Sequence, residues 1–250
     1  MEEINESLIK IHVELGEINK ALEAARRNNR QLCSEEWLNA VKNSLNNCDQ
    51  TLIAIASLSD LDKSLFYDSL LHCFDAQSII YISEKTDHRI KFKDLEYIFK
   101  QHLKCRIHNA SRDINFRAMM DLADYALRTY IDTESTIESN RHGKIQNFSF
   151  KYNLWKEIRN VALDENRTED FITASERLKE PITRDEAIIL ISAHLDCIKI
   201  KLMEKRLGGI SNDSTSDIRV QDLKVYKQIS KLLPYLTEEE NIIFRTALFE

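Results

Sequence analysis

The sequence predicts an all-α protein, and three observations support this prediction. The chain of 250 residues contains 4 Gly and 2 Pro, whereas average usage would give about thirty. So few residues able to adopt positive φ or end a helix cannot supply the many tight turns of a sandwich, propeller or barrel. Apolar residues recur at helical steps of three and four along most of the chain. The one alternating segment, 145–152, would be a lone strand without a partner.

We expect residues 1–58 to form an antiparallel, coiled-coil-like hairpin of two long helices. Apolar residues occupy alternating steps of four and three from residue 4 to 32, and a second such run spans 38–55. Ser34 is the predicted N-cap between the two helices. Ile9 and Val13 lie on a second face of the first helix, so they cover either the rest of the chain or another molecule. Gly16, inside the same helix, is explained by the close approach of a neighbouring helix, so these three residues are candidates for an interaction surface.

Residues 59–250 are expected to form a multi-helix bundle. The predicted helices cover about 60–83, 91–106, 111–133, 152–163, 168–180, 184–207, 218–233 and 238–250. Capping boxes, in which a Ser or Thr and a Glu three residues later satisfy the first free N–H groups, begin at Thr183 and Thr237. We expect a subdivision near 132–150, a mobile loop at 208–217, and a central position for the helix at 184–207, which is apolar on most sides.

An internal repeat is not expected from the sequence. Trp155, Phe171, Ala174 and Pro181 are faintly similar to a tetratricopeptide unit. However, Ala174 and Pro181 are too far apart for that motif, and no echo at a period of 34 residues occurs elsewhere.

Composition places the protein among non-membrane proteins of the cytoplasm. The chain has no apolar run of 18 residues, and it opens with acidic residues rather than with the basic region of a signal peptide. Its five cysteines form an odd number without a C-x-x-C motif, which predicts reduced thiols in the core. Ile, Asn and Lys together make up 65 residues, a bias typical of AT-rich genomes that fits a role in phage–host conflict or as an effector.

The sequence predicts neither an enzyme nor a bound cofactor. It lacks G-x-S-x-G, paired Glu-x-x-His motifs, and the Arg followed four to six residues later by His that marks helical ribonucleases. His102, Cys105 and His108 recur at steps of three, so one helix cannot wrap them around a single ion, and we predict no metal site. A metal-dependent helical hydrolase with an unrecognised acidic site, such as Asp121 and Asp124, remains the third hypothesis.

The leading functional hypothesis is a non-catalytic protein–protein interaction subunit, an adaptor, scaffold or inhibitor that binds another protein or itself. Two observations support this hypothesis: the sequence has apolar heptad seams, and it contains no catalytic motif among those considered. The alternative is nucleic-acid binding through residues 85–117, which contain nine Lys or Arg against four acids. The candidate contacts on that basic face are Lys93, Tyr97, Lys100, Lys104 and Arg106.

Overall fold

A computed structural model describes residues 2–105, 112–131, 141–206 and 225–249, and confirms the all-α class. Every regular element within these ranges is helical. The chain divides into two compact units, Met1–Ser139 and Asn140–Glu250, so residues 1–58 belong to the same unit as 59–139. We describe each unit by itself.

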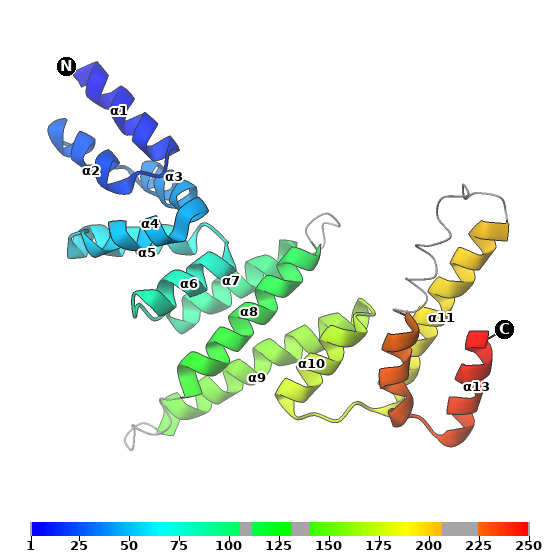
Figure 1. Cartoon of the computed structure of the whole chain (residues 1–250). Helices are drawn as coiled ribbons and strands as arrows, with labels where there is room; N and C mark the ends of the chain where they lie inside the picture. Colours follow the sequence, from blue (N-terminus) through cyan, green and yellow to red (C-terminus); the bar gives the residue numbers. More distant parts are fainter. Residues whose placement is uncertain (1, 106–111, 132–140, 207–224, 250) are drawn as a thin grey trace. The chain divides into compact units, whose positions relative to one another are not determined.

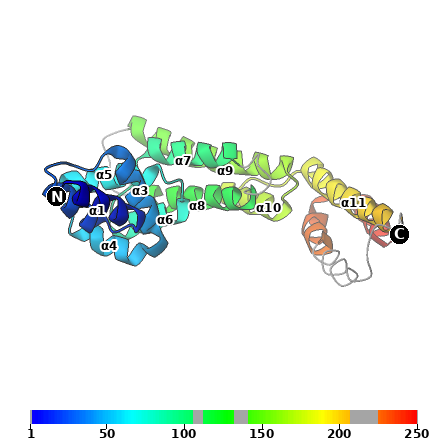
Figure 2. The same ribbon diagram turned by 90° about the horizontal axis from the view of Figure 1, so that it is seen from above.

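The first unit contains eight α-helices within its described residues (Figure 1). They are α1 (Glu2–Glu14), α2 (Ile18–Arg27), α3 (Ser34–Ser44), α4 (Cys48–Ala56), α5 (Asp60–Leu71), α6 (Ala76–Lys85), α7 (Phe92–Cys105) and α8 (Arg112–Ile131), with the 3-10 turn η1 (Leu45–Asn47) before α4. In this unit α1 packs on α2 and α3, α3 packs on α5, and both α6 and α7 pack on α8, as Figure 2 shows from a second direction.

The second unit is built from longer helices. They are α9 (Arg141–Asp164), α10 (Thr168–Leu178), α11 (Arg184–Arg206), a helix at 225–232 that runs into the 3-10 turn η5 (Leu233–Tyr235), and α13 (Glu238–Phe249). Within this unit α10 packs along α9, and η5 contacts α11.

The predicted two-helix hairpin of residues 1–58 is not what the structure has. The chain turns at Gly16, whose φ is 68°, so the first long helix is two helices, α1 and α2, folded against each other. The seam is consequently divided, and its residues Ile4 in α1 and Leu15 directly after α1 are both 65% exposed. Ile9 and Val13 are buried instead, and they cover the rest of the chain, which is the first of the two alternatives.

Several helix boundaries also differ from the predicted ones. A positive φ at Phe74 divides the helix expected at 60–83 into α5 and α6. Helix α9 begins at Arg141, inside the segment expected to be a loop. Cys33, and not Ser34, is the N-cap of α3. The predicted loop at 208–217 lies outside the described residues.

Two predictions about the core are wrong. Helix α11 is not a central helix, because it is covered on one side only: Leu190 and Ile191 are buried, whereas Ile189 and Ile200 are exposed. The five cysteines carry free thiols, but none lies in the core, and those of Cys33, Cys105 and Cys197 are exposed.

Three helix starts, by contrast, agree with the predicted ones. The hydroxyl of Ser59 accepts a hydrogen bond from the backbone N–H of Asp62 at 3.2 Å. The side chains of Glu186 and Glu240 accept hydrogen bonds from the backbone N–H groups of Thr183 and Thr237 at 2.9 and 3.0 Å. These contacts connect residues three apart in sequence, so a local pattern is enough to predict them.

The structure contains an internal repeat, contrary to the expectation from sequence. The six residues with positive φ among the described residues form three pairs, each thirteen residues apart: Gly16 and Asn29, Phe74 and Asp87, Asn166 and Lys179. Each pair encloses a short helix that lies between two other helices. We call these three-helix modules repeat A (α1–α3), repeat B (α5–α7) and repeat C (α9–α11); equivalent residues differ in number by 58 between A and B and by 92 between B and C.

The repeats share one burial pattern. Eight positions are buried in all three modules. In repeat A they are Ile18, Ala21, Ala24, Ala25, Leu32, Trp37, Ala40 and Val41, in repeat B Ala76, Ile79, Ile82, Ser83, Ile90, Leu95, Ile98 and Phe99, and in repeat C Thr168, Phe171, Ala174, Ser175, Ile182, Ala187, Leu190 and Ile191. Since each repeat buries the same face of its second and third helices, the three modules share one architecture.

A polar cluster joins the helices of each repeat at equivalent places. In repeat A, the Arg30 guanidinium donates to the carboxylates of Glu6 and Glu36 at 2.7–2.9 Å. In repeat C the charge is supplied from the first helix, where Arg159 donates to Glu186, the equivalent of Glu36, at 2.8 Å. Such bidentate or paired contacts fix the angle between helices as well as adding stability.

In repeat B an aromatic contact replaces the ion pair. His88, the equivalent of Arg30, stacks on Tyr67 of α5 with ring centroids 3.5 Å apart and planes within 5°. Burial lowers the pKa of His88 below its ordinary value, so this ring is neutral at pH 7.

Gly16→Ala tests the close packing in repeat A. A Cβ atom at Gly16 would lie 2.5 Å from the backbone nitrogen of Ser44, so we expect a loss of roughly 2–4 kcal/mol in the free energy of unfolding, from overlap and positive φ together. Asn166→Ala, at the equivalent turn of repeat C, has the φ penalty alone and should cost about 1 kcal/mol. Urea unfolding can be followed separately in each repeat. Trp37 fluorescence in a Trp155→Phe background reports on repeat A, and Trp155 fluorescence in a Trp37→Phe background reports on repeat C. Equal losses in the two variants would contradict the close contact.

Acid should weaken repeat A through its ion-pair cluster. The hydrogen bonds from Arg30 lower the pKa of Glu36 from its ordinary 4.5 to about 2. Stabilisation by this carboxylate is therefore complete above about pH 4.5 and is lost as the pH falls toward 2. In Glu36→Gln the free energy of unfolding should therefore change less over that pH window than in the wild type, by roughly 1–2 kcal/mol. This difference is small because the cluster is partly exposed. The exposed neighbour Glu35→Gln is the control, and parallel pH profiles for wild type and Glu36→Gln would refute the assignment.

Candidate functional site

A groove recurs at the turn between the first and second helices of the repeats in the first unit. In repeat A it has a volume of about 380 Å³ and is lined by the α1–α2 turn, the end of α3, and α4. In repeat B it has a volume of about 450 Å³ and is lined by the α5–α6 turn, α7 and α8. The two grooves occupy equivalent places, so the groove follows from the repeat geometry, and any function must come from the residues that line it.

The groove of repeat B contains an unusual turn residue. Phe74 adopts a φ of 54°, a conformation that is rare for a bulky side chain and costs of the order of 1–3 kcal/mol. The equivalent residues are Gly16 and Asn166, two types that adopt this conformation more readily. Gly16 allows its turn to lie against the backbone of α3, whereas a side chain as large as that of Phe74 prevents the same approach in repeat B.

Large apolar side chains form the rim of this groove. Phe74 is 39% exposed, and its ring centroid lies 6.0 Å from that of Tyr97, which is also exposed. Ile114, on α8, is 73% exposed. Clustered exposed apolar side chains beside a cavity are typical of a surface that binds a partner.

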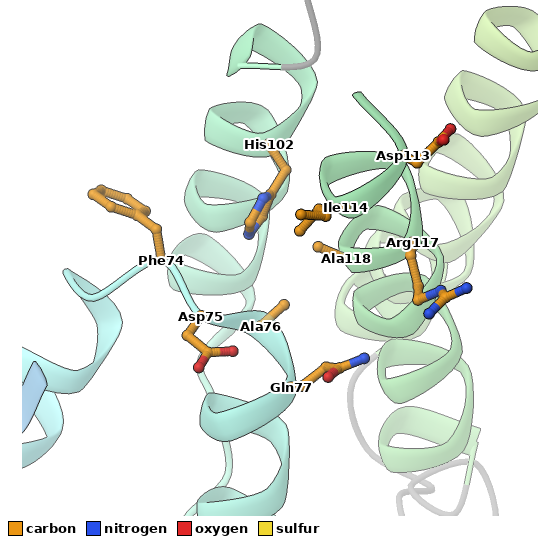
Figure 3. A pocket seen from close by; sticks show the side chains of 9 residues that line it. All are labelled: Phe74, Asp75, Ala76, Gln77, His102, Asp113, Ile114, Arg117 and Ala118. Carbon is orange, nitrogen blue, oxygen red and sulfur yellow. The ribbon is translucent and has the colours of Figure 1, made fainter. Parts of the chain in front are cut away.

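His102 is the buried polar group of the groove. Its side chain is 6% exposed, and Figure 3 shows the ring reaching from α7 toward Ile114 and Ala118 of α8. The ring atom Nδ1 lies 2.8 Å from Oδ1 of Asn115. Because an amide oxygen accepts, Nδ1 is the donor in this contact, and Nε2 has no hydrogen-bond partner among the described residues.

Two polar residues that line the groove form hydrogen bonds within the fold. Asp75 caps α6, accepting from the backbone N–H and the hydroxyl of Ser78 at 3.3 and 2.7 Å. Gln77 donates to Asp121 at 3.3 Å. Among the described residues that line the groove there is no Ser, Cys, Lys or Tyr, so none of them supplies a hydroxyl, thiol or amine nucleophile beside His102.

The predicted basic face lies on the exposed side of α7. Lys93, Tyr97, Lys100 and Lys104 are all exposed, and Lys100 donates to Glu96 at 2.6 Å. The fifth candidate, Arg106, lies outside the described residues. Tyr97 is therefore shared between this face and the rim of the groove.

The other candidates from sequence are not brought together as a surface. Ile9 and Val13 lie in the core of the first unit, while Gly16 lines the groove of repeat A. Sequence reasoning missed Phe74 and Ile114 as functional residues, because in a helical pattern they looked like ordinary apolar positions. Phe74 is recognised as unusual only when the three repeats are aligned on their turns, because the equivalent residues are Gly16 and Asn166.

The acidic pair Asp121 and Asp124 lines a second groove, of about 300 Å³, between α6 and α8. Arg128 donates there to Glu84 at 3.0 Å, so the groove already contains a cation. Among the described residues no group of three or more His, Cys, Asp or Glu side chains could hold a metal ion.

The chain has no match among protein-family models, curated proteins or solved structures. In the described part of the chain, no helix combines the length and apolar character that crossing a membrane requires.

Proposed function

We propose that this protein is a non-catalytic interaction subunit that binds a protein partner in the groove of repeat B. The observation that carries the proposal is Phe74, an aromatic residue in a strained conformation at the rim of a 450 Å³ cavity. Strain of this kind is kept where the side chain serves a purpose other than folding. Phe74, Tyr97 and Ile114 supply the aromatic and aliphatic contacts that dominate protein interfaces.

Two rim variants test the proposal by capture and cross-linking from a lysate of the native host. Phe74→Asn takes the residue found in repeat C, so it should relieve the strained turn and keep the fold while removing the ring. Ile114→Asp places a charge on the rim. We expect both to lower partner recovery at least tenfold, the effect of removing an interface anchor.

Ile53→Asp is the matched control, because Ile53 is 73% exposed, as is Ile114, but lies on α4. Thermal unfolding checks that all three variants remain folded. A partner that binds the rim variants and wild type equally would refute the assignment to this groove, and the absence of any specific partner would refute the interaction role.

Nucleic-acid binding is the second candidate, favoured by one observation: Lys93, Lys100 and Lys104 are exposed together with Tyr97, so one face of α7 offers both cations and a ring for stacking. Lys93→Glu with Lys104→Glu should weaken binding to a fluorescent single-stranded 20-mer and reduce the slope of log K against log salt by about two. The charge-matched control is Lys10→Glu with Lys227→Glu, both at exposed positions. Binding that is absent, insensitive to salt or equal in the two double variants would eliminate this candidate.

A further inference from the structure

Helix α1 is apolar on two opposite faces. Ile9 and Val13 face inward and are buried. The second set, Ile4, Leu8, Ile11 and Leu15, is centred about 150° away around the axis, at 100° per residue. Three of these four are exposed and Leu8 is half-buried. A helix that is apolar on both sides is normally covered on both sides, and α1 is covered on one.

The other repeats show that this face is a packing surface. In repeat C the equivalents of Ile4, Leu8 and Ile11 are Leu154, Ile158 and Val161, and all three are buried. In repeat B the equivalent of Leu8 is Phe66, which is fully buried, and its helix α5 packs on α3. The outer face of α1 is therefore the exposed copy of a face that is covered elsewhere in the same molecule.

The spacing of the exposed residues fits a second copy of the same helix. Steps of four, three and four place Ile4, Leu8, Ile11 and Leu15 at alternating d and a positions of a heptad. In an antiparallel pair of α1 helices, Leu8 of one copy would meet Ile11 of the other, and Ile4 would meet Leu15. All four residues of each copy then find an apolar partner.

The flanking residues are electrostatically compatible with this pairing. At the e positions Asn5 would face His12 of the other copy, and at the g positions Ser7 would face Glu14. Each pair joins an uncharged residue to an ionisable one, so no like charges meet, and opposed helix dipoles favour the antiparallel order. A parallel pair with Leu at a and Ile at d favours three or four strands, whereas α1 has one free side, because α2 and α3 pack on the other.

We infer that two copies of this chain associate through the outer face of α1, as an antiparallel helix pair about a two-fold axis. Four apolar side chains per copy are a small surface, so the dimer dissociates readily. This association uses a different face from the groove of repeat B and is independent of the proposed partner there.

Sedimentation equilibrium of the full chain tests the association between about 1 and 200 µM, a range that covers weak dimers. We expect a concentration-dependent dimer whose Kd rises at least tenfold in Ile11→Asp and in Leu15→Asp. Ile53→Asp, which adds the same charge at a more exposed isoleucine, should leave the dimer unchanged. Circular dichroism confirms that each variant is folded. A monomer throughout the range, or a dimer that survives both α1 substitutions, would overturn the inference.

Disulfide trapping tests the antiparallel order. The exposed Cys33, Cys105 and Cys197 are first replaced by Ser. A mixture of Leu8→Cys and Ile11→Cys copies should then form a mixed disulfide faster than either copy alone forms a symmetric one. Faster symmetric linkage through residue 8 would show a parallel pair and contradict the proposed arrangement.

Discussion

The backbone turn of positive φ is the constraint on which the architecture depends. Each repeat contains two such turns, thirteen residues apart, and they fix where its second helix begins and ends. A second helix of 10 or 11 residues is too short to be stable alone, so its stability comes from the face it buries between its neighbours. The turns bring that face into register, which explains why the same eight positions are buried in every repeat.

The residue chosen at the first turn decides what the groove beside it can do. Gly16 lets the backbone of repeat A close tightly on Ser44, and the energy of that fit stabilises the fold. Phe74 adopts the same positive φ at a cost in strain and supplies an exposed ring next to Tyr97 instead. The two grooves have the same origin in the repeat, but one side chain turns a packing contact into a surface suited to a partner.

Local signals correctly predicted three of the helix starts, whereas the longer-range hydrophobic pattern led to a wrong prediction. The caps at Ser59, Thr183 and Thr237 span three residues, so the sequence contains all the information they require. Apolar residues keep their steps of three and four across the break at residues 15–17, so the sequence of two helices has the pattern of one. The repeat could not be detected in the sequence because equivalent buried positions have side chains of different size. Ala21 and Trp37 in repeat A correspond to Phe171 and Ala187 in repeat C. The large side chain is therefore on the third helix in repeat A and on the second helix in repeat C, while both positions are buried in both repeats.

The seam in α1 shows what a hydrophobic pattern can and cannot determine. The spacing of Ile4, Leu8, Ile11 and Leu15 identifies a helix face that excludes water, and the equivalent face in repeat C is buried. The pattern does not say which element covers that face, because any helix with matching spacing would serve. In this chain the expected cover was residues 34–58, but the turn at Gly16 directs Ile9 and Val13 toward α3 instead. The seam is thereby left exposed, and α1 of a second copy, which has matching spacing and compatible flanking charges, is the cover that we propose for it.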